Sequence, residues 1–106
     1  MKPPPEDGVF RALADPSRRR MLDVLKESPG LAVGELADRF KFSRFAVMKH
    51  LKILEEVGLV VPRREGKIKR LYLNAVPVQM IYDRWISQFS AVWASRLTTL
   101  KYNLEG

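Results

Sequence analysis

The spacing of apolar residues along the chain predicts a protein built mainly of helices. After Arg44, the residues Val47, Leu51 and Leu54 recur at intervals of three and four. In a helix of about 3.6 residues per turn, this spacing gathers them on one face. Segment 44–57 is therefore predicted to be a helix that buries this face. The same periodicity predicts further helices over residues 7–14, 16–27, 33–40 and 78–104. The second of these is expected to bury Met21, Leu22 and Leu25, and the third to bury Leu36, Ala37 and Phe40.

Several predicted helix ends carry residues that typically cap them. Asp15 can cap the helix over 16–27, with Pro16 at the first helical position, where its missing N–H costs nothing. Ser43 is likewise a suitable N-cap for the helix that follows it. Gly58 is placed to end that helix as a C′ residue. These signals support the predicted boundaries.

Between residues 59 and 74 the pattern changes to short runs that are β-branched or alternating. LVVPRR and KIKRLYLN flank Glu65-Gly66, which is typical turn chemistry. The sequence therefore predicts a two-stranded hairpin, in which Pro62 indicates an edge strand or the end of one. The order is helix, helix, helix, helix, strand, strand, helix: a mainly α fold with a small β-hairpin.

The length of 106 residues is that of one domain. Residues 1–6 are predicted to be a flexible tail, residues 7–75 the compact unit, and residues 76–106 a C-terminal helix of the same domain. That helix carries a long apolar stripe, which comprises Ile81, Trp85, Phe89, Val92, Trp93, Leu97, Leu100 and Leu104. A small domain cannot cover so long a stripe from within, so part of it is expected to pack on a second copy of the chain.

Positive charge is concentrated in two short segments. The net charge is +7, which favours a polyanionic partner. Residues 39–52 contain five basic residues and no acid, and residues 63–70 contain five more with only Glu65 opposed, so these segments hold ten of the 19 cations. Such a local concentration of positive charge is typical of a nucleic-acid-binding surface.

The outer arc of helix 44–57 carries Arg44, Phe45, Met48, Lys49 and Lys52. A basic second helix after a tight turn is typical of the helix-turn-helix, whose second helix enters the major groove. Arg44 and Lys49 can donate to guanine, and Phe45 or Met48 can lie against a thymine methyl group. Ser43 can bind a phosphate or a base. Glu55 and Glu56 are expected only to be solvated.

The predicted hairpin would flank this helix as a basic wing. Its cations are expected to bind phosphates or the adjacent minor groove, which supplies affinity without reading sequence. They are Arg63, Arg64, Lys67, Lys69 and Arg70. The sequence therefore predicts a winged helix-turn-helix protein that binds double-stranded DNA.

Three segments resemble one known family. The winged helix-turn-helix of the ArsR/SmtB transcriptional regulators resembles three stretches of this chain. They are ALADPSRRRMLDVL, then SRFAVMKHLKILEEVGLV, then VPRREGKIKRLYLN. YDRWISQFSAVWASRLTTL resembles the metal-independent, autorepressor-like branch. The resemblance implies a homodimeric repressor that binds a palindromic operator, reads DNA with Ser43 to Leu54 and uses Pro62 to Leu71 as the wing. It places the dimer interface on the first and last helices, at Phe10, Trp85, Phe89, Trp93, Leu97 and Leu100.

The chain departs from the family pattern at Phe45 and Met48, where a proline or small polar residue and a serine are usual. Base specificity therefore cannot be carried over from the family. An alternative stays open, in which this apolar pair belongs to a winged-helix module that binds another protein. A non-specific basic nucleic-acid binder is the third hypothesis.

Other functions are excluded or left open by the sequence. There is no cysteine and one histidine, so we predict no metal site, and no cofactor or catalytic motif is apparent. No apolar run is long enough to span a membrane and the N-terminus is not a signal peptide, so a cytoplasmic protein is expected. His50 and Arg18 to Arg20 can be structural or contact DNA. Trp85, Phe89 and Trp93 can form an interface or a ligand pocket, and any small-molecule effector is unknown.

Overall fold

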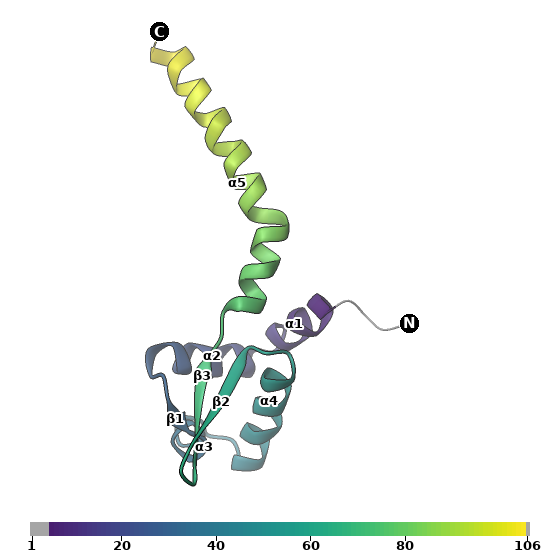
Figure 1. Ribbon diagram of the computed structural model, residues 1–106, viewed down its shortest axis with the longest axis vertical. Coiled ribbons are helices and arrows are strands. Elements are labelled where there is room, and N and C mark those ends of the chain that lie inside the picture. Colours follow the sequence, from purple (N-terminus) through teal and green to yellow (C-terminus); the bar gives the residue numbers. More distant parts are fainter. Residues whose placement is uncertain (1–4, 106) are drawn as a thin grey trace.

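The computed structural model describes residues 5–105, with side chains described for 6–85 and 92–101. A small helical body carries one long helix that extends away from it (Figure 1). The elements are α1 (Pro5–Leu13), α2 (Pro16–Glu27), β1 (Leu31–Ala32), α3 (Val33–Ala37), α4 (Arg44–Glu56), β2 (Val60–Glu65), β3 (Ile68–Leu73) and α5 (Val76–Glu105).

The core joins α1, α2, α3 and α4 to the sheet. Its fully buried side chains include Met21 and Leu25 of α2, Leu36 of α3 and Leu71 of β3. Burial of the predicted inward faces of α2 and α4 is confirmed, because Met21, Leu22, Leu25, Val47, Leu51 and Leu54 all lie in this core. Residues spaced three and four apart thus share one face, as the helical period requires.

The helix ends confirm the predicted caps. Asp15 accepts a hydrogen bond from the Arg18 backbone N–H at 2.9 Å, and Pro16 opens α2. Ser43 Oγ accepts from the Ala46 N–H at 3.1 Å. Gly58, just past α4, has a φ of 79°, the left-handed conformation that suits glycine at a helix end. α4 therefore has a defined start and a defined end.

The sheet is larger than the predicted hairpin. It has three antiparallel strands in the order β1-β3-β2, with Leu31 of β1 opposite Leu71 of β3. β2 lies at an edge, which accommodates Pro62. The turn falls one residue later than expected, on residues 66–67, and Gly66 adopts a φ of 63°. A glycine with positive φ at the first turn position suits a tight hairpin.

Two predicted boundaries were wrong. α1 begins at Pro5, so Glu6 belongs to a helix and not to the tail expected over residues 1–6; residues 1–4 lie outside the described part of the chain. α3 ends at Ala37, three residues before the predicted end. Phe40, expected on its inner face, instead lies in the following turn and packs against the core from there.

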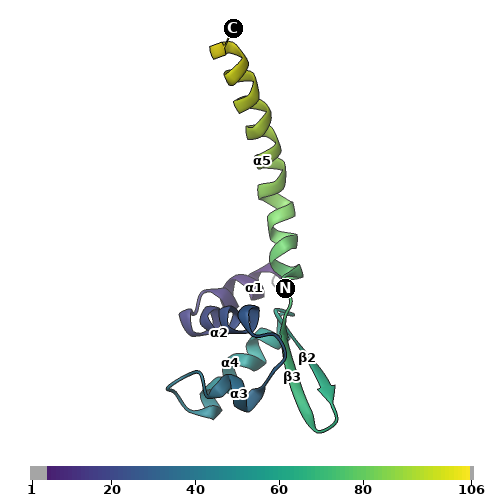
Figure 2. The same ribbon diagram turned by 90° about the vertical axis from the view of Figure 1, so that its left-hand side faces the viewer.

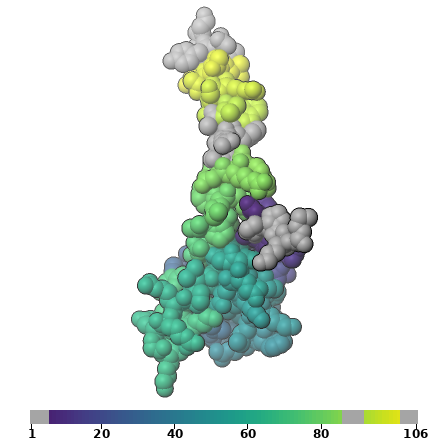
Figure 3. Space-filling view, turned by 45° about the vertical axis from the view of Figure 1, so that its right-hand side comes forward, coloured from purple at the N-terminus to yellow at the C-terminus, as the bar shows by residue number. Residues whose placement is uncertain are grey.

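The first part of α5 packs on α1, and the rest extends beyond the body (Figures 1 and 3). The rings of Phe10 and Trp85 stack with centroids 6.1 Å apart, and Arg84 pairs with Glu6 at 3.3 Å. Beyond this contact the described apolar side chains of α5 are half exposed, at Val92, Trp93, Leu97 and Leu100. Phe89 and Leu104 lie outside the described side chains. No described helix is long and apolar enough to cross a membrane.

The Asp15 cap gives a pH-dependent contribution to stability. The hydrogen bond from the Arg18 backbone N–H lowers the pKa of Asp15 below its usual value of 3.8. Asp15→Ala is expected to lower the free energy of unfolding by about 1 kcal/mol at neutral pH. Because the folded pKa is the lower one, this stabilisation is present above pH 3.8 and is lost as pH falls through the folded pKa.

Urea unfolding of both proteins from pH 7 to pH 2.5 measures this difference. Asp15→Asn serves as the control, because it keeps a neutral acceptor at the cap and should show a weaker pH dependence than the wild type. A difference between wild type and Asp15→Ala that does not change with pH would contradict the assignment.

Candidate nucleic-acid interface

The packing of α4 decides which of its side chains face outward. Val47, Leu51 and Leu54 are buried against the body, so the opposite arc faces solvent. Five residues of that arc are exposed, and we call them the reading face: Arg44, Phe45, Met48, Lys49 and Lys52. Both large apolar members are mostly open, Phe45 at 69% and Met48 at 54%. The predicted outer arc is therefore a free surface of the described chain.

Basic residues face one another across the hairpin. Arg63 lies opposite Arg70, and Arg64 lies opposite Lys69. Neighbouring residues of a strand point to opposite faces, so each face of the hairpin carries one pair of like charges. Directly opposed like charges destabilise a sheet. This arrangement is unfavourable in isolation and becomes favourable beside a polyanion.

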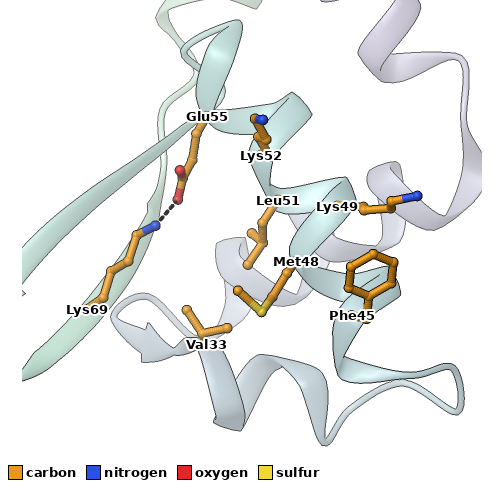
Figure 4. A pocket seen from close by; sticks show the side chains of 8 residues that line it. All are labelled: Val33, Phe45, Met48, Lys49, Leu51, Lys52, Glu55 and Lys69. Carbon is orange, nitrogen blue, oxygen red and sulfur yellow. Dashed lines mark ion pairs between the residues drawn. The ribbon is translucent and has the colours of Figure 1, made fainter.

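Two of the wing cations also have partners inside the protein. Lys69 Nζ lies 2.8 Å from Glu55 Oε1, which joins the wing to α4 (Figure 4). Arg70 pairs with Glu65 across the hairpin and donates to the Gly30 carbonyl at 3.0 Å. The hydrogen bond and charge of Glu65 raise the pKa of Arg70 above its usual value. Both cations therefore fix the position of the wing.

The remaining wing cations are at the outer part of the hairpin. Arg63, Arg64 and Lys67 are exposed and make no ion pair with the side chains that the structure describes. Views at right angles place this hairpin and α3 at the end of the body away from α5 (Figures 1 and 2). These three charges are available to phosphates, whereas Lys69 and Arg70 would first have to leave their partners.

An open hollow of about 450 Å³ lies between α4, the start of α3 and the wing (Figure 4). Its lining is largely apolar, with lysines around it. The lining residues are Val33, Phe45, Met48, Lys49, Leu51, Lys52, Glu55 and Lys69. Lys49 Nζ lies 5.0 Å from the centre of the Phe45 ring, a cation–π distance. The reading face thus combines apolar surface with cations.

Glu55 was the residue that sequence reasoning missed. It was expected to be solvated, but its Oε1 is buried and faces Lys69. No aligned hydrogen bond reaches this oxygen among the described residues, so the lysine charge compensates its burial. Helical spacing gave no signal for this contact, because the partner lies fourteen positions away on another element.

Two of the three arginines near the start of α2 bond to the end of α1. Arg18 donates to the carbonyls of Ala12 at 2.8 Å and Arg11 at 3.0 Å, and Arg19 donates to Leu13 at 2.6 Å. These bonds satisfy carbonyls of the last turn of α1, where few helical N–H donors remain.

The single histidine is also held within the body. His50 Nδ1 lies 3.4 Å from Arg18 Nη1 and 3.9 Å from Asp15, and its ring meets Phe42 edge-on. Of the two hypotheses for His50, these contacts favour the structural one. Among the described residues no three His, Cys, Asp or Glu side chains are grouped so that they could hold a metal ion.

The core-facing α4, its exposed basic face and the adjoining hairpin define a winged helix-turn-helix protein. Residues 13–63 match the sequence profile of a family described as a helix-turn-helix domain. The chain is 38% identical over 87 residues to the uncharacterized HTH-type transcriptional regulator YuzN of Bacillus subtilis, covering 76% of this chain and 95% of that one. It is 33% identical over 73 residues to the transcriptional repressor SdpR of the same organism. This match covers 69% of this chain and 80% of SdpR.

A solved structure has a similar fold. The ArsR-like transcriptional regulator from Rhodococcus sp. RHA1 superposes with a TM-score of 0.70 at 30% identity, over 92% of this chain and 91% of that one. The chain therefore belongs to the ArsR family of winged helix-turn-helix transcriptional regulators. It is a DNA-binding transcriptional regulator and not an enzyme, as the sequence predicted.

The Lys69–Glu55 contact can be tested by its effect on stability. Lys69→Met leaves the buried Glu55 oxygen without a positive partner and is expected to lower the free energy of unfolding by about 1 kcal/mol. The double variant Lys69→Met/Glu55→Gln should recover part of this loss, because it removes the uncompensated charge. Urea unfolding at neutral pH measures each step of the cycle.

Lys67→Met is the matched control, since Lys67 is an exposed lysine of the same hairpin. Its effect should stay within about 0.5 kcal/mol. If the Lys69 and Lys67 variants are equally stable, the ion pair does not hold the wing.

Proposed function

We propose that this regulator is a homodimeric repressor that binds a palindromic operator, with α4 of each protomer in the major groove and each wing on the adjacent backbone or minor groove. The observation that carries the proposal is the exposed basic reading face of α4, beside a hairpin whose Arg63, Arg64 and Lys67 are also exposed. The N-terminal half of α4 holds Arg44, Phe45, Met48 and Lys49, and it is this end of a reading helix that contacts bases.

The α5 stripe supports a dimer. At about 100° per residue, Trp85, Val92, Trp93 and Leu100 share a sector about 100° wide. All four are exposed, between 45% and 53%. Apolar side chains so aligned along a projecting helix are typical of a protein interface. A second copy can cover this stripe with its own, and Phe10 and Trp85 extend the same surface onto α1.

A two-fold dimer supports the palindrome. A symmetric pair presents two identical reading helices, so each would read the same sequence on opposite strands. Repression is supported by the relative that is named a transcriptional repressor. Contacts from α4 would give the sequence preference, and contacts from the wing would supply affinity that does not depend on sequence.

Two variants separate these roles on DNA. Lys49→Ala is expected to reduce discrimination between a duplex selected from a random library and its scrambled version, by about tenfold, because a base contact is lost. Arg64→Ala should instead weaken both duplexes alike. It should also lower the slope of log affinity against log salt by about 0.9 per arginine, or about 1.8 per dimer. Fluorescence anisotropy over a range of salt concentrations measures both effects.

Lys101→Ala is the charge-matched control, because Lys101 lies near the far end of α5. This variant should leave both the DNA affinity and the slope of log affinity against log salt unchanged. Equal affinity of the wild type for every duplex would exclude sequence-specific binding. Negligible binding to all of them would favour the alternative in which Phe45 and Met48 bind another protein.

The dimer is tested by placing a charge on the stripe. Leu100→Glu would bury a carboxylate against apolar side chains and is expected to raise the dimer dissociation constant at least a hundredfold. Sedimentation velocity across a dilution series measures this constant. Operator affinity should fall in parallel, because one protomer binds only one half-site.

Thr98→Glu is the matched control on the same helix. At about 100° per residue it lies on the side of α5 opposite the stripe centre. It adds the same charge two residues away and should leave the dimer intact. If both variants behave alike, α5 does not form the interface through this stripe.

A further inference from the structure

The reading face contains an apolar pair that phosphate binding does not explain. Phe45 and Met48 are three residues apart, so they are neighbours on the surface of α4. They are 69% and 54% exposed, and both line the hollow beside the wing. A polyanion gains nothing from such groups. An apolar group on the molecule that this face meets would bury this pair.

We propose that Phe45 and Met48 bind the C5-methyl group of a thymine and make that thymine a specificity determinant of the operator half-site. This inference rests on the proposed docking of α4 in the major groove. The thymine methyl is the apolar group that the major-groove edges present to a side chain. Phe45 is the second residue of α4, and Met48 lies less than one turn later, at the end of the helix that meets bases.

The surrounding charges support DNA as the occupant of this hollow. Lys49 and Lys52 stand at its edge on α4 (Figure 4). Lys49 lies beside Phe45, whereas Lys52 lies nearer to Glu55, which is paired with Lys69 at 2.8 Å (Figure 4). Because the Glu55 and Lys69 charges offset each other, Lys49 and Lys52 leave the hollow with a net positive charge, which favours a phosphate-bearing ligand. A neutral apolar ligand or peptide would gain nothing from these lysines.

The Phe45–Lys49 contact adds a constraint on the neighbouring base. Lys49 Nζ is held 5.0 Å from the Phe45 ring centre. That distance corresponds to one or two base-pair steps of about 3.4 Å. Lys49 donates well to guanine O6 and N7. The half-site is therefore expected to contain a guanine one or two base pairs from the thymine that Phe45 contacts.

The experiment replaces thymine by deoxyuridine, which pairs identically but lacks the methyl group. A duplex is first selected from a random library with the wild-type protein, and each thymine is then replaced in turn. At one thymine per half-site the replacement should weaken wild-type binding about fourfold, the factor expected for one buried methyl group. The other thymines should show no effect. Fluorescence anisotropy gives the dissociation constants.

Protein variants show whether this methyl group meets the apolar pair. Phe45→Ala or Met48→Ala should abolish the difference between thymine and deoxyuridine at that position. Phe45→Leu should keep it, because an apolar side chain remains there. Ile53→Ala is the matched control, since Ile53 is an exposed apolar residue of α4 that does not line the hollow. All three sites are exposed, and thermal unfolding checks that each variant is folded.

Three outcomes overturn the proposal while leaving the proposed function standing. In the first, a specific duplex is bound but no deoxyuridine replacement weakens it. In the second, Phe45→Ala and Met48→Ala weaken thymine and deoxyuridine duplexes equally. In the third, they change no DNA affinity, which would assign the pair to a protein or small-molecule partner. Failure of the wild type to select any duplex would instead contradict the proposed function itself.

Discussion

The burial of one side of α4 is the constraint on which the rest of the interface depends. Val47, Leu51 and Leu54 are held in the core with almost no exposed area. Their burial fixes the rotation of the helix about its own axis, and a side chain such as Lys49 can then point only outward. Ser43 and Gly58 fix where the helix begins and ends. The chemistry of the reading face is thus positioned by apolar packing on the other side of the same helix.

The wing reflects a balance between stability and function. Two pairs of like charges face each other across β2 and β3, Arg63 with Arg70 and Arg64 with Lys69, and this repulsion destabilises the sheet. Glu65 and Glu55 offset part of this repulsion through Arg70 and Lys69, and the same contacts attach the hairpin to the body. The charges left without such partners are at the outer part of the hairpin, where phosphates would neutralise them. Positioning and binding are therefore divided between different cations of one hairpin.

Periodicity and capping allowed most of this fold to be predicted, because both are local properties of the sequence. The inward faces of α2 and α4, the Asp15 and Ser43 caps and the order of the main elements all depend on residues close together in the chain. β1 was missed because two residues carry no periodic signal, and its pairing depends on Leu71, forty positions away. The Glu55–Lys69 pair was missed for the same reason. Phe45 and Met48 were recognised as exposed, but the hollow beside them depends on Val33 and Lys69 from other elements.

The long helix α5 links assembly to recognition in the proposed dimer. One reading helix covers only a few base pairs, so specificity requires two that are about 34 Å apart on the same side of the duplex. Within the chain, α5 is attached to the body through α1, by the Phe10–Trp85 stack and the Arg84–Glu6 pair. The angle at which two α5 helices pack would therefore set the distance between the two copies of α4. In such a dimer the apolar stripe determines the spacing of the half-sites, although none of its residues would touch DNA.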